Sequence, residues 1–244
     1  MQPFLFLERV FAYLQGKGYG TATIDQEVRY ALKLLGRQPR LVLDIGANKG
    51  LWTQSLLRLH PQCVVHAFEP QPACNRILQT MFGSTPNVSL HANALSNVQQ
   101  TLSLYFDEEG SGLASLSKRE LSHHGIDFSK SVKVDAVVVD EFLAGAALGA
   151  IDIVKMDVEG HEMAVFEGMK KTLAGPAAPE VIQFEFGGCN IDSRTFFRDF
   201  YLLLKDRYHF YRQTPFTLEL LTTYHEADEC FRTTNFFLKL KSSR

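Results

Sequence analysis

The stretch Leu41-Val42-Leu43-Asp44-Ile45-Gly46-Ala47-Asn48-Lys49-Gly50 decides the fold of this chain. Its first five residues are apolar except for one aspartate, which predicts a short buried strand. Gly46 and Gly50 follow, where a chain leaving a strand turns sharply into a helix, and glycine permits the positive φ of such a turn. We therefore expect the first strand and helix of an open α/β sheet, with a ligand crevice beyond the carboxyl end of the strand.

A carboxylate stands at the corresponding point of the next strand. The apolar run 64–68 is followed directly by Glu69 and Pro70. The carboxyl ends of both strands face the same crevice in a parallel sheet. A carboxylate there can accept hydrogen bonds from both vicinal hydroxyls of a ribose, and each such bond contributes about 1.5–3 kcal/mol. The sequence thus predicts that Glu69 binds the nucleoside part of a cofactor.

The first loop argues against a dinucleotide. The dinucleotide fingerprint G-x-G-x-x-G brings backbone N–H groups up to a pyrophosphate, whereas here Ala47, Asn48 and Lys49 separate the two glycines. Asp44 would repel a pyrophosphate and attract a cationic ligand. S-adenosylmethionine carries an ammonium and a sulfonium and no phosphate, so we expect this cofactor. The alternative is that Asp44 merely caps the following helix.

Composition narrows the class of protein. The chain has 244 residues, 45% of them hydrophobic, and a net charge of −2, which suits one catalytic α/β domain and argues against nucleic acid as a partner. The four cysteines form no C-x-x-C pair, which is typical of reduced thiols in the cytoplasm. No apolar run approaches the roughly 20 residues of a membrane span. Oligomeric state leaves no signal in the sequence.

The order of elements predicts a helical leader, 1–40, and a single domain, 41–244. Residues 4–14 read as an amphipathic helix that we expect to pack on its own domain, although a membrane surface or a partner could also receive it. The polar stretch near 107–130 interrupts the alternation of strands and helices and is expected to be a lid or binding loop. Further expected elements are strands 88–92, 101–106, 132–139, 151–156 and 181–186, helices 24–35, 51–59, 71–82, 161–173 and 193–206, and a late antiparallel pair, 208–212 and 236–240, at the sheet edge.

A second polar cluster follows the fourth parallel strand, where residues 155–162 read Lys-Met-Asp-Val-Glu-Gly-His-Glu. Its two glutamates favour the N-terminus of the helix that follows. Asp157 and His161 are not needed for the fold and are therefore candidates for catalysis. Glu185 lies near the end of the neighbouring apolar strand, and an aligned Asp157 and Glu185 would form a carboxylate pair in which repulsion and burial raise one pKa.

These residues suggest general bases and, as an alternative, a metal site. His161 is the first candidate base, because its unperturbed pKa of about 6.5 suits proton removal near neutrality. Asp157 and Glu185 are rivals, and His123 and His124 could reach the site if the insertion closes over it. A magnesium ion is possible but has no specific support; Asp157, Glu185 and Asn190 could supply its oxygen ligands.

Four motifs in this order resemble the FkbM family of S-adenosylmethionine-dependent methyltransferases, over about Leu41 to Phe186. They are Asp44-Ile45-Gly46-Ala47-Asn48-x-Gly50, Phe68-Glu69-Pro70, Asn93-Ala94-Leu95-Ser96 and Lys155-x-Asp157-x-Glu159-Gly160-x-Glu162. The resemblance implies a class I methyltransferase, Rossmann-like fold: a seven-stranded, mostly parallel sheet with helices on both faces.

The resemblance also implies roles for particular residues. Asp44, Gly46 and Gly50 would shape the methionine end of the cofactor site, with Ala47, Asn48 and Asp157 close by. Glu69 would hold the ribose, and Asn93 and Ala94 would lie near the adenine. The expected reaction is O-methylation of a hydroxyl on a sugar, a glycan or a natural-product small molecule. The alternatives are an NAD(P)-dependent oxidoreductase and a non-catalytic scaffold that only binds the cofactor.

Overall fold

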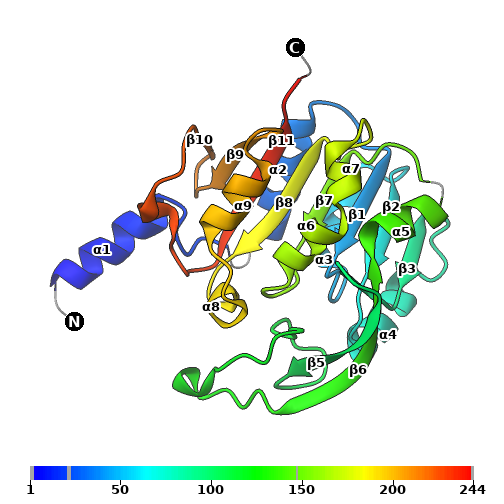
Figure 1. The fold of residues 1–244 in the computed structure, drawn as a ribbon, viewed down its shortest axis with the longest axis horizontal. Coiled ribbons are helices and arrows are strands. Elements are labelled where there is room, and N and C mark those ends of the chain that lie inside the picture. Colours follow the sequence, from blue (N-terminus) through cyan, green and yellow to red (C-terminus); the bar gives the residue numbers. More distant parts are fainter. Residues whose placement is uncertain (1–2, 21–22, 147, 243–244) are drawn as a thin grey trace.

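The computed structural model describes residues 3–20, 23–146 and 148–242, and its centre is an eight-stranded sheet (Figure 1). The strand order is β10-β9-β11-β8-β7-β1-β2-β3. Strands β1, β2, β3, β7 and β8 run parallel, while β11 is antiparallel to both β8 and β9. The strands are β1 Leu41–Ile45, β2 Val64–Phe68, β3 Val88–His91, β7 Ile153–Met156, β8 Val181–Phe186, β9 Tyr208–Gln213, β10 Leu218–Leu221 and β11 Thr234–Leu240.

This sheet confirms the predicted α/β class, but its strand order differs from the prediction in two respects at one edge. The late antiparallel pair is present as β9 and β11. However, β11 lies between β8 and β9 instead of at the edge, and β10 adds an eighth strand through an antiparallel pairing with β9. Short hairpin partners such as β10, whose residues are only partly buried or exposed, carry little hydrophobic pattern by which a sequence could reveal them.

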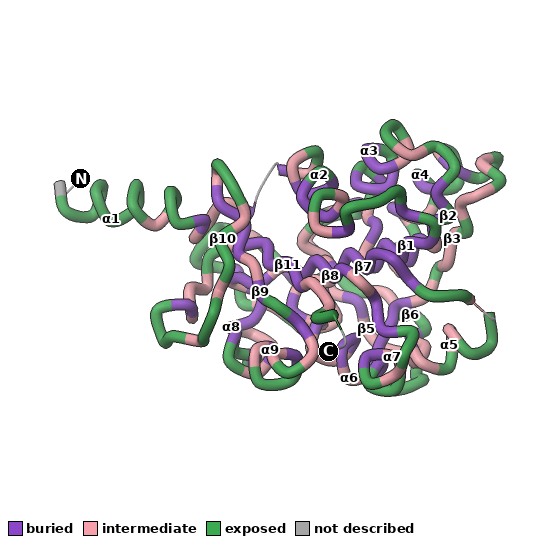
Figure 2. Tube along the Cα trace, turned by 90° about the horizontal axis from the view of Figure 1, so that it is seen from above, coloured by how far each residue is buried: buried purple, intermediate pink, exposed green. Residues whose placement is uncertain are grey.

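Helices cover both faces of the sheet, and Figure 2 shows the two layers on opposite sides of it. One face packs against α2 Ile24–Leu35, α3 Leu51–Leu59 and α4 Pro72–Phe82 through one buried apolar cluster. A second cluster packs the other face against α5 Val139–Gly145, α6 Glu162–Gly168, α7 Lys170–Ala174 and α9 Phe197–Leu204. Alternation along the strands produces both layers: in β8, Phe184 and Phe186 belong to the second cluster, whereas Val181 belongs to the first.

The single helix expected at 161–173 is two helices, α6 and α7, which break at Met169. At this break the backbone approaches another strand closely. A Cβ atom on Gly168 would lie 1.9 Å from the carbonyl oxygen of Ser96, so only glycine fits. Another short helix, α8 Cys189–Ser193, precedes α9.

The insertion begins from a small second sheet of order β4-β6-β5. Its strands are β4 Ala94–Ser96, β5 Gln100–Phe106 and β6 Lys130–Val138, and β5 and β6 form a long antiparallel hairpin. The segment between β5 and β6 carries the short 3-10 helix Ser122–His124 and runs below the main sheet in Figure 1.

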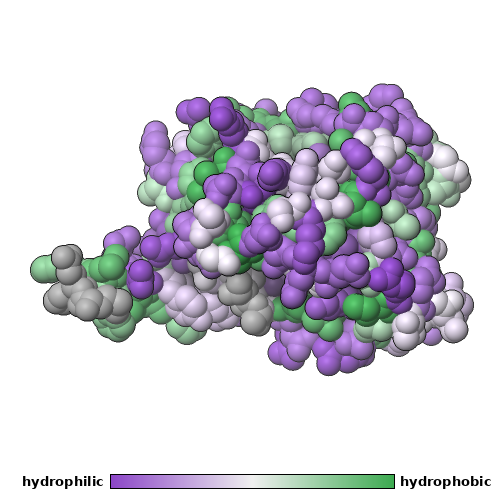
Figure 3. Space-filling view, turned by 90° about the horizontal axis from the view of Figure 1, so that it is seen from below, coloured by the Kyte–Doolittle hydropathy of each residue, from purple (hydrophilic) through white to green (hydrophobic). Residues whose placement is uncertain are grey.

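The two helices of the leader behave differently. Helix α2 ends at Gly36, whose φ of 74° gives the left-handed C-cap that glycine favours, and buries Val28 and Ala31 completely against the domain. Helix α1, Pro3–Leu14, extends away from the body (Figure 1), and Figure 3 shows apolar side chains along this projection. Phe4 is 83% exposed and Phe11 is 59% exposed. The expectation that this helix packs on its own domain was therefore wrong. None of the described helices combines the length and apolar character needed to cross a membrane.

Candidate functional site

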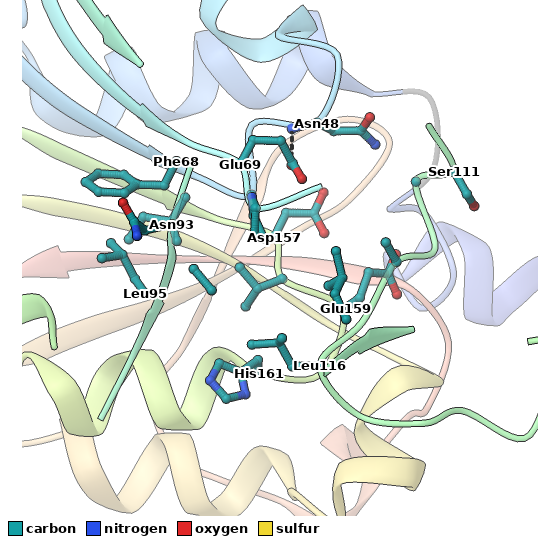
Figure 4. Close-up of a pocket in the computed structure, with 18 residues that line it drawn as sticks. Asn48, Phe68, Glu69, Asn93, Leu95, Ser111, Leu116, Asp157, Glu159 and His161 are labelled. Atoms are coloured by element: carbon teal, nitrogen blue, oxygen red, sulfur yellow. Dashed lines mark hydrogen bonds between the residues drawn. The ribbon is translucent and has the colours of Figure 1, made fainter. Parts of the chain in front are cut away.

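A pocket opens at the carboxyl ends of β1, β2 and β7 and is covered by the insertion (Figure 4). The main sheet contributes Gly46, Glu69 and Asp157 to its walls, and residues 93–95 close one end. The insertion supplies Ser111 and Leu116, which lie across the pocket from the strand ends. The predicted crevice is thus present, with loops from distant parts of the chain around it.

Gly46 allows the β1 loop to approach β7. Its φ is 75°, and a Cβ atom at this position would lie 1.8 Å from the carbonyl oxygen of Asp157. The N–H groups of Gly46 and Ala47 both donate to the carbonyl of Phe68 at 2.9 Å, which fixes the loop on β2. Gly50 also has a positive φ, 77°. The expectation that both glycines provide left-handed turns is confirmed.

The carboxylate of Glu69 is held by the backbone on two sides. Its Oε2 accepts a hydrogen bond from the N–H of Asn48 at 2.8 Å, and its Oε1 accepts one from the N–H of Gln71 at 2.7 Å. Asn48 itself is a non-glycine residue with a φ of 48°, and this conformation aims its N–H at the carboxylate. Burial raises the pKa of Glu69 to about 7 although both hydrogen bonds act to lower it. Each carboxylate oxygen keeps a lone pair for a ligand in the pocket.

Asp44 does not face this pocket, although we expected its charge to meet a cationic ligand. The side chain is fully buried, with Oδ1 3.1 Å from Nζ of Lys155 and Oδ2 accepting a hydrogen bond from Oγ of Thr53 at 2.6 Å. Nζ of Lys155 also donates to the carbonyl of Gly46 at 2.6 Å. Asp44 therefore acts on the β1 loop through Lys155. The capping alternative is not observed either, because α3 has Gly50 at its N-cap and no side-chain capping bond.

Apolar side chains line another part of the pocket, which suits an aromatic base. Phe68, Leu95, Leu104 and Val158 line the pocket together with Asn93, whose amide offers both a donor and an acceptor. His161 lies at this level as well (Figure 4), with Nε2 3.0 Å from Oγ of the buried Ser96. Burial lowers the pKa of His161 to about 4, so its imidazole is neutral near pH 7.

The three candidate bases are not brought to one place. Met156 on β7 is paired with Phe184 on β8, so that Asp157 and Glu185 follow at the next position of neighbouring strands. Burial and then the charge of Asp157 raise the pKa of Glu185 well above its ordinary value, as expected for a carboxylate pair. Asp157 lines the main pocket together with His161 and also lines a neighbouring cavity together with Glu185, whereas His161 and Glu185 share neither.

The proposed magnesium ligands do not form a set. Oδ1 of Asn190 accepts a hydrogen bond from the N–H of Gly187 at 2.9 Å and is therefore occupied. Among the described residues, Glu159, Glu185 and Cys189 do place possible ligand atoms within 4.8 Å of one another. This group includes a thiol, which magnesium does not favour, and Glu159 is already paired with Arg119. The structure gives the magnesium alternative no support.

The insertion is attached to the site on both sides. Nη1 of Arg119 lies 2.6 Å from Oε2 of Glu159, and Oγ of Ser115 donates to the carbonyl of Glu159 at 2.7 Å. On the other side, the N–H of Gly110 donates to Oε1 of Gln71 at 2.8 Å. Burial and the charge of Asp157 raise the pKa of Glu159 to about 8, while Arg119 opposes this shift. Residues 107–130 thus contribute directly to the pocket.

Comparison with known proteins fits this geometry. The sequence model described as the methyltransferase FkbM domain matches residues 44–212, which is more than half of the chain. The chain belongs to the FkbM methyltransferase family.

Curated relatives of this FkbM protein are distant. It is 28% identical over 154 residues to the 2-O-methyltransferase NoeI of Sinorhizobium fredii, a match that covers 59% of this chain and 63% of NoeI. It is 30% identical over 154 residues to the methyltransferase sdnD of Sordaria araneosa, covering 52% of this chain and 60% of sdnD. The chain thus spans about three-fifths of the length of these relatives.

Solved structures show the same fold. The crystal structure of the methyltransferase FkbM from Methylobacillus flagellatus gives a TM-score of 0.50 at 14% identity and covers 82% of this chain and 44% of that one. The O-methyltransferase from Bacillus cereus, solved in complex with S-adenosylhomocysteine, gives a TM-score of 0.51 at 13% identity over 98% of this chain and 89% of that one. The class I methyltransferase fold predicted from the sequence is confirmed.

The FkbM motifs fall into two groups in space. Of the residues predicted to bind the cofactor, those that line the main pocket are Gly46, Asn48, Glu69, Asn93, Ala94 and Asp157. Ala47 lines only the neighbouring cavity, whereas Asp44 and Gly50 line neither and support the loop from behind.

Two contributors to the site were missed in the sequence, Ser115 and Arg119. The glycines of the insertion indicated a loop, but no local pattern identifies which of its residues reach Glu159. His123 and His124, which we considered as catalytic groups, are exposed and line neither the main pocket nor the neighbouring cavity.

Proposed function

We propose that this protein is an S-adenosylmethionine-dependent O-methyltransferase that acts on a hydroxyl of a sugar, a glycan or a natural-product small molecule. The observation that carries the proposal is the carboxylate of Glu69, which two backbone N–H groups hold at the wall of a pocket with an apolar end. A ribose with two vicinal hydroxyls fits the free lone pairs of this group.

S-adenosylmethionine, when bound, would supply a methyl group activated by its sulfonium. The chain must then hold the acceptor oxygen in line and take its proton. Asp157 supports this role, because it lines both the main pocket and the neighbouring cavity. A positioned carboxylate base contributes about 10²–10⁴ to the rate. We propose Asp157 as the base, with Glu185 beside it.

His161 becomes a weaker candidate on two grounds. Its Nε2 is engaged with Ser96, and it lies among the residues of the apolar end. We propose that it shapes the nucleoside pocket. Replacing His161 by alanine should then weaken the binding of S-adenosylhomocysteine and leave the pH profile of turnover unchanged; loss of a titration step from the kcat/KM profile with normal binding would make His161 the base instead.

The test of the proposed function begins with calorimetric titration of the whole chain with S-adenosylhomocysteine, NADH and NADPH. We expect micromolar binding of S-adenosylhomocysteine alone. Release of S-adenosylhomocysteine from S-adenosylmethionine in the presence of neutral glycosides would then measure methyl transfer. Binding of a nicotinamide cofactor alone would contradict the proposal, and binding without transfer in the wild type would favour a cofactor-binding scaffold.

A cytoplasmic location forms part of the same proposal. The cysteines are free in the structure, and Cys63, Cys74 and Cys189 are buried. Reduced, buried thiols are typical of proteins in a reducing compartment.

A further inference from the structure

A second cavity adjoins the main pocket on the far side of the β1 loop. The two share Gly46, Asn48, Gly112 and Asp157 as common walls. The volume of this cavity is about 410 Å³, which falls within the range of about 300–1,000 Å³ that small-molecule sites occupy. It contains neither Glu69 nor the residues of the apolar end. This cavity is therefore separate from the nucleoside pocket but meets it at Asp157.

Four residues of the wall lie outside the family match of residues 44–212. Helix α2 and the residues before it supply Gly20, Ile24 and Glu27, and β11 supplies Asn235. The insertion contributes only Gly112. The cavity is therefore framed mainly by the β1 loop, the start of α3 and the ends of β7 and β8, with further walls from the N-terminal leader and β11 and little of the loop that covers the cofactor pocket.

A chain of buried polar groups forms the floor of the cavity. Oε1 of Glu27 accepts a hydrogen bond from Oγ1 of Thr23 at 2.7 Å, and Oε2 accepts one from Nε2 of Gln183 at 2.7 Å. Oε1 of Gln183 in turn accepts a hydrogen bond from the indole N–H of Trp52 at 3.1 Å. Glu27 is 7% exposed and Gln183 is 2% exposed. An apolar core at this position would be simpler to pack, because buried polar groups cost free energy unless they are satisfied.

Glu185 is one group in this cavity with capacity to spare. Within the described parts of the chain it makes no side-chain hydrogen bond and no ion pair, and it remains partly exposed to the cavity. Its neighbours Glu27 and Asp157 are also acidic. Of the two lysines in the lining, Lys155 is paired with Asp44 and Lys49 is exposed. Such a wall offers oxygen acceptors to hydroxyl groups, and its three carboxyl groups outnumber the lysines, which disfavours phosphate or carboxylate groups.

We propose that this second cavity is the acceptor site, that it takes a neutral polyhydroxylated molecule, and that Glu185 and helix α2 determine which acceptor is bound. The inference rests on the proposed function and adds to it the position and class of the acceptor. Glu185 accepts a hydrogen bond from an acceptor hydroxyl next to the one that is methylated. Its partner Asp157 faces the reacting hydroxyl from the shared wall.

The first measurement is saturation-transfer NMR of the whole chain, loaded with S-adenosylhomocysteine, with three probes that share one sugar ring and differ in charge. These are methyl α-D-glucopyranoside, its 6-phosphate and the corresponding 2-amino sugar, which is cationic. We expect binding of the neutral glycoside and none of the phosphate. Binding of the phosphate or of the amino sugar alone, or of no probe, would overturn the assignment of a neutral polyol.

The second measurement compares variants. Glu185→Ala should weaken binding of the neutral glycoside by about 10-fold, because the acceptor of a hydroxyl hydrogen bond is lost. Ile24→Trp, at a partly exposed wall position, should block the cavity and abolish glycoside binding. Asp25→Asn, on the exposed side of the same helix, is the matched control and should change nothing. Thermal unfolding checks that each variant is folded.

The affinity for S-adenosylhomocysteine separates this inference from the proposed function. It should stay within about twofold of the wild type in the Ile24→Trp variant, since the nucleoside pocket is untouched. If that affinity falls about 10-fold with the glycoside, the cavity holds the amino-acid end of the cofactor and the acceptor assignment is wrong. Unchanged glycoside binding in folded Ile24→Trp and Glu185→Ala would also overturn it. Failure of the wild type to bind S-adenosylhomocysteine would instead refute the proposed function.

Discussion

Replacing Glu69 by alanine is the sharpest test of the cofactor site. The substitution removes a carboxylate that is 7% exposed and is already bound to the N–H groups of Asn48 and Gln71. Two hydrogen bonds from ribose hydroxyls to this group would be lost with it. At about 1.5–3 kcal/mol each, the loss is about 3–6 kcal/mol, and since about 1.4 kcal/mol is a factor of ten in affinity, S-adenosylhomocysteine should bind at least about 100-fold more weakly.

Calorimetry with S-adenosylhomocysteine measures this effect directly, and thermal unfolding shows whether the variant folds. The two N–H groups that lose their acceptor are next to the pocket, where water can replace the carboxylate, so we expect a folded variant. Glu141→Ala removes an exposed carboxylate from α5 and serves as the control. A folded Glu69→Ala protein that binds within about threefold of the wild type would refute the position of the ribose and the proposed function with it.

The remaining predictions concern stability. Gly46→Ala should destabilise the protein by about 3 kcal/mol or more, because its Cβ would lie 1.8 Å from a carbonyl oxygen. The control Gly125→Ala has a similar φ and nothing within 4 Å of its Cβ, so it should cost only about 1–2 kcal/mol. Equal losses of unfolding free energy in urea would contradict the close approach at Gly46. Burial raises the pKa of Glu162 from its model-compound value of 4.5 to about 7 in the folded protein, so its contribution to stability is present below pH 4.5 and is lost as the pH rises through 7. Glu162→Gln keeps an acceptor for the N–H groups of Val158 and Gly160. Between pH 5 and pH 8 the free energy of unfolding of this variant should therefore fall by about 2 kcal/mol less than that of the wild type. The same dependence of unfolding free energy on pH in both proteins would show that Glu162 does not titrate in this range.

Local patterns made the sheet and half of the site predictable. The strand before Gly46 and the strand before Glu69 are apolar runs of five residues, and their adjacency follows from the rules of parallel sheets. The conformations of Gly46 and Gly50 follow from the same turn. Glu69 could be identified because its position at a strand end is a local property.

Contacts between distant segments were not predictable. Glu27 and Gln183 are 156 positions apart, and their hydrogen bond depends on how α2 lies on the sheet. Arg119 reaches Glu159 from an insertion whose only described helix is the short 3-10 turn Ser122–His124. Helix α1 was misjudged for a different reason: an apolar pattern indicates that a helix has a face to bury, but not which surface covers it.

The buried pair of Asp44 and Lys155 has a consequence for how sequences of this kind are compared. Neither member can be replaced singly without leaving an unpaired charge in the interior, a loss of about 3–5 kcal/mol, and Lys155 also supports the carbonyl of Gly46. The two positions should therefore vary together across evolution or remain fixed together. Asp44 and Lys155 are part of the FkbM motifs, but they indicate an intact fold. A homologue that had lost methyltransferase activity would still have both residues.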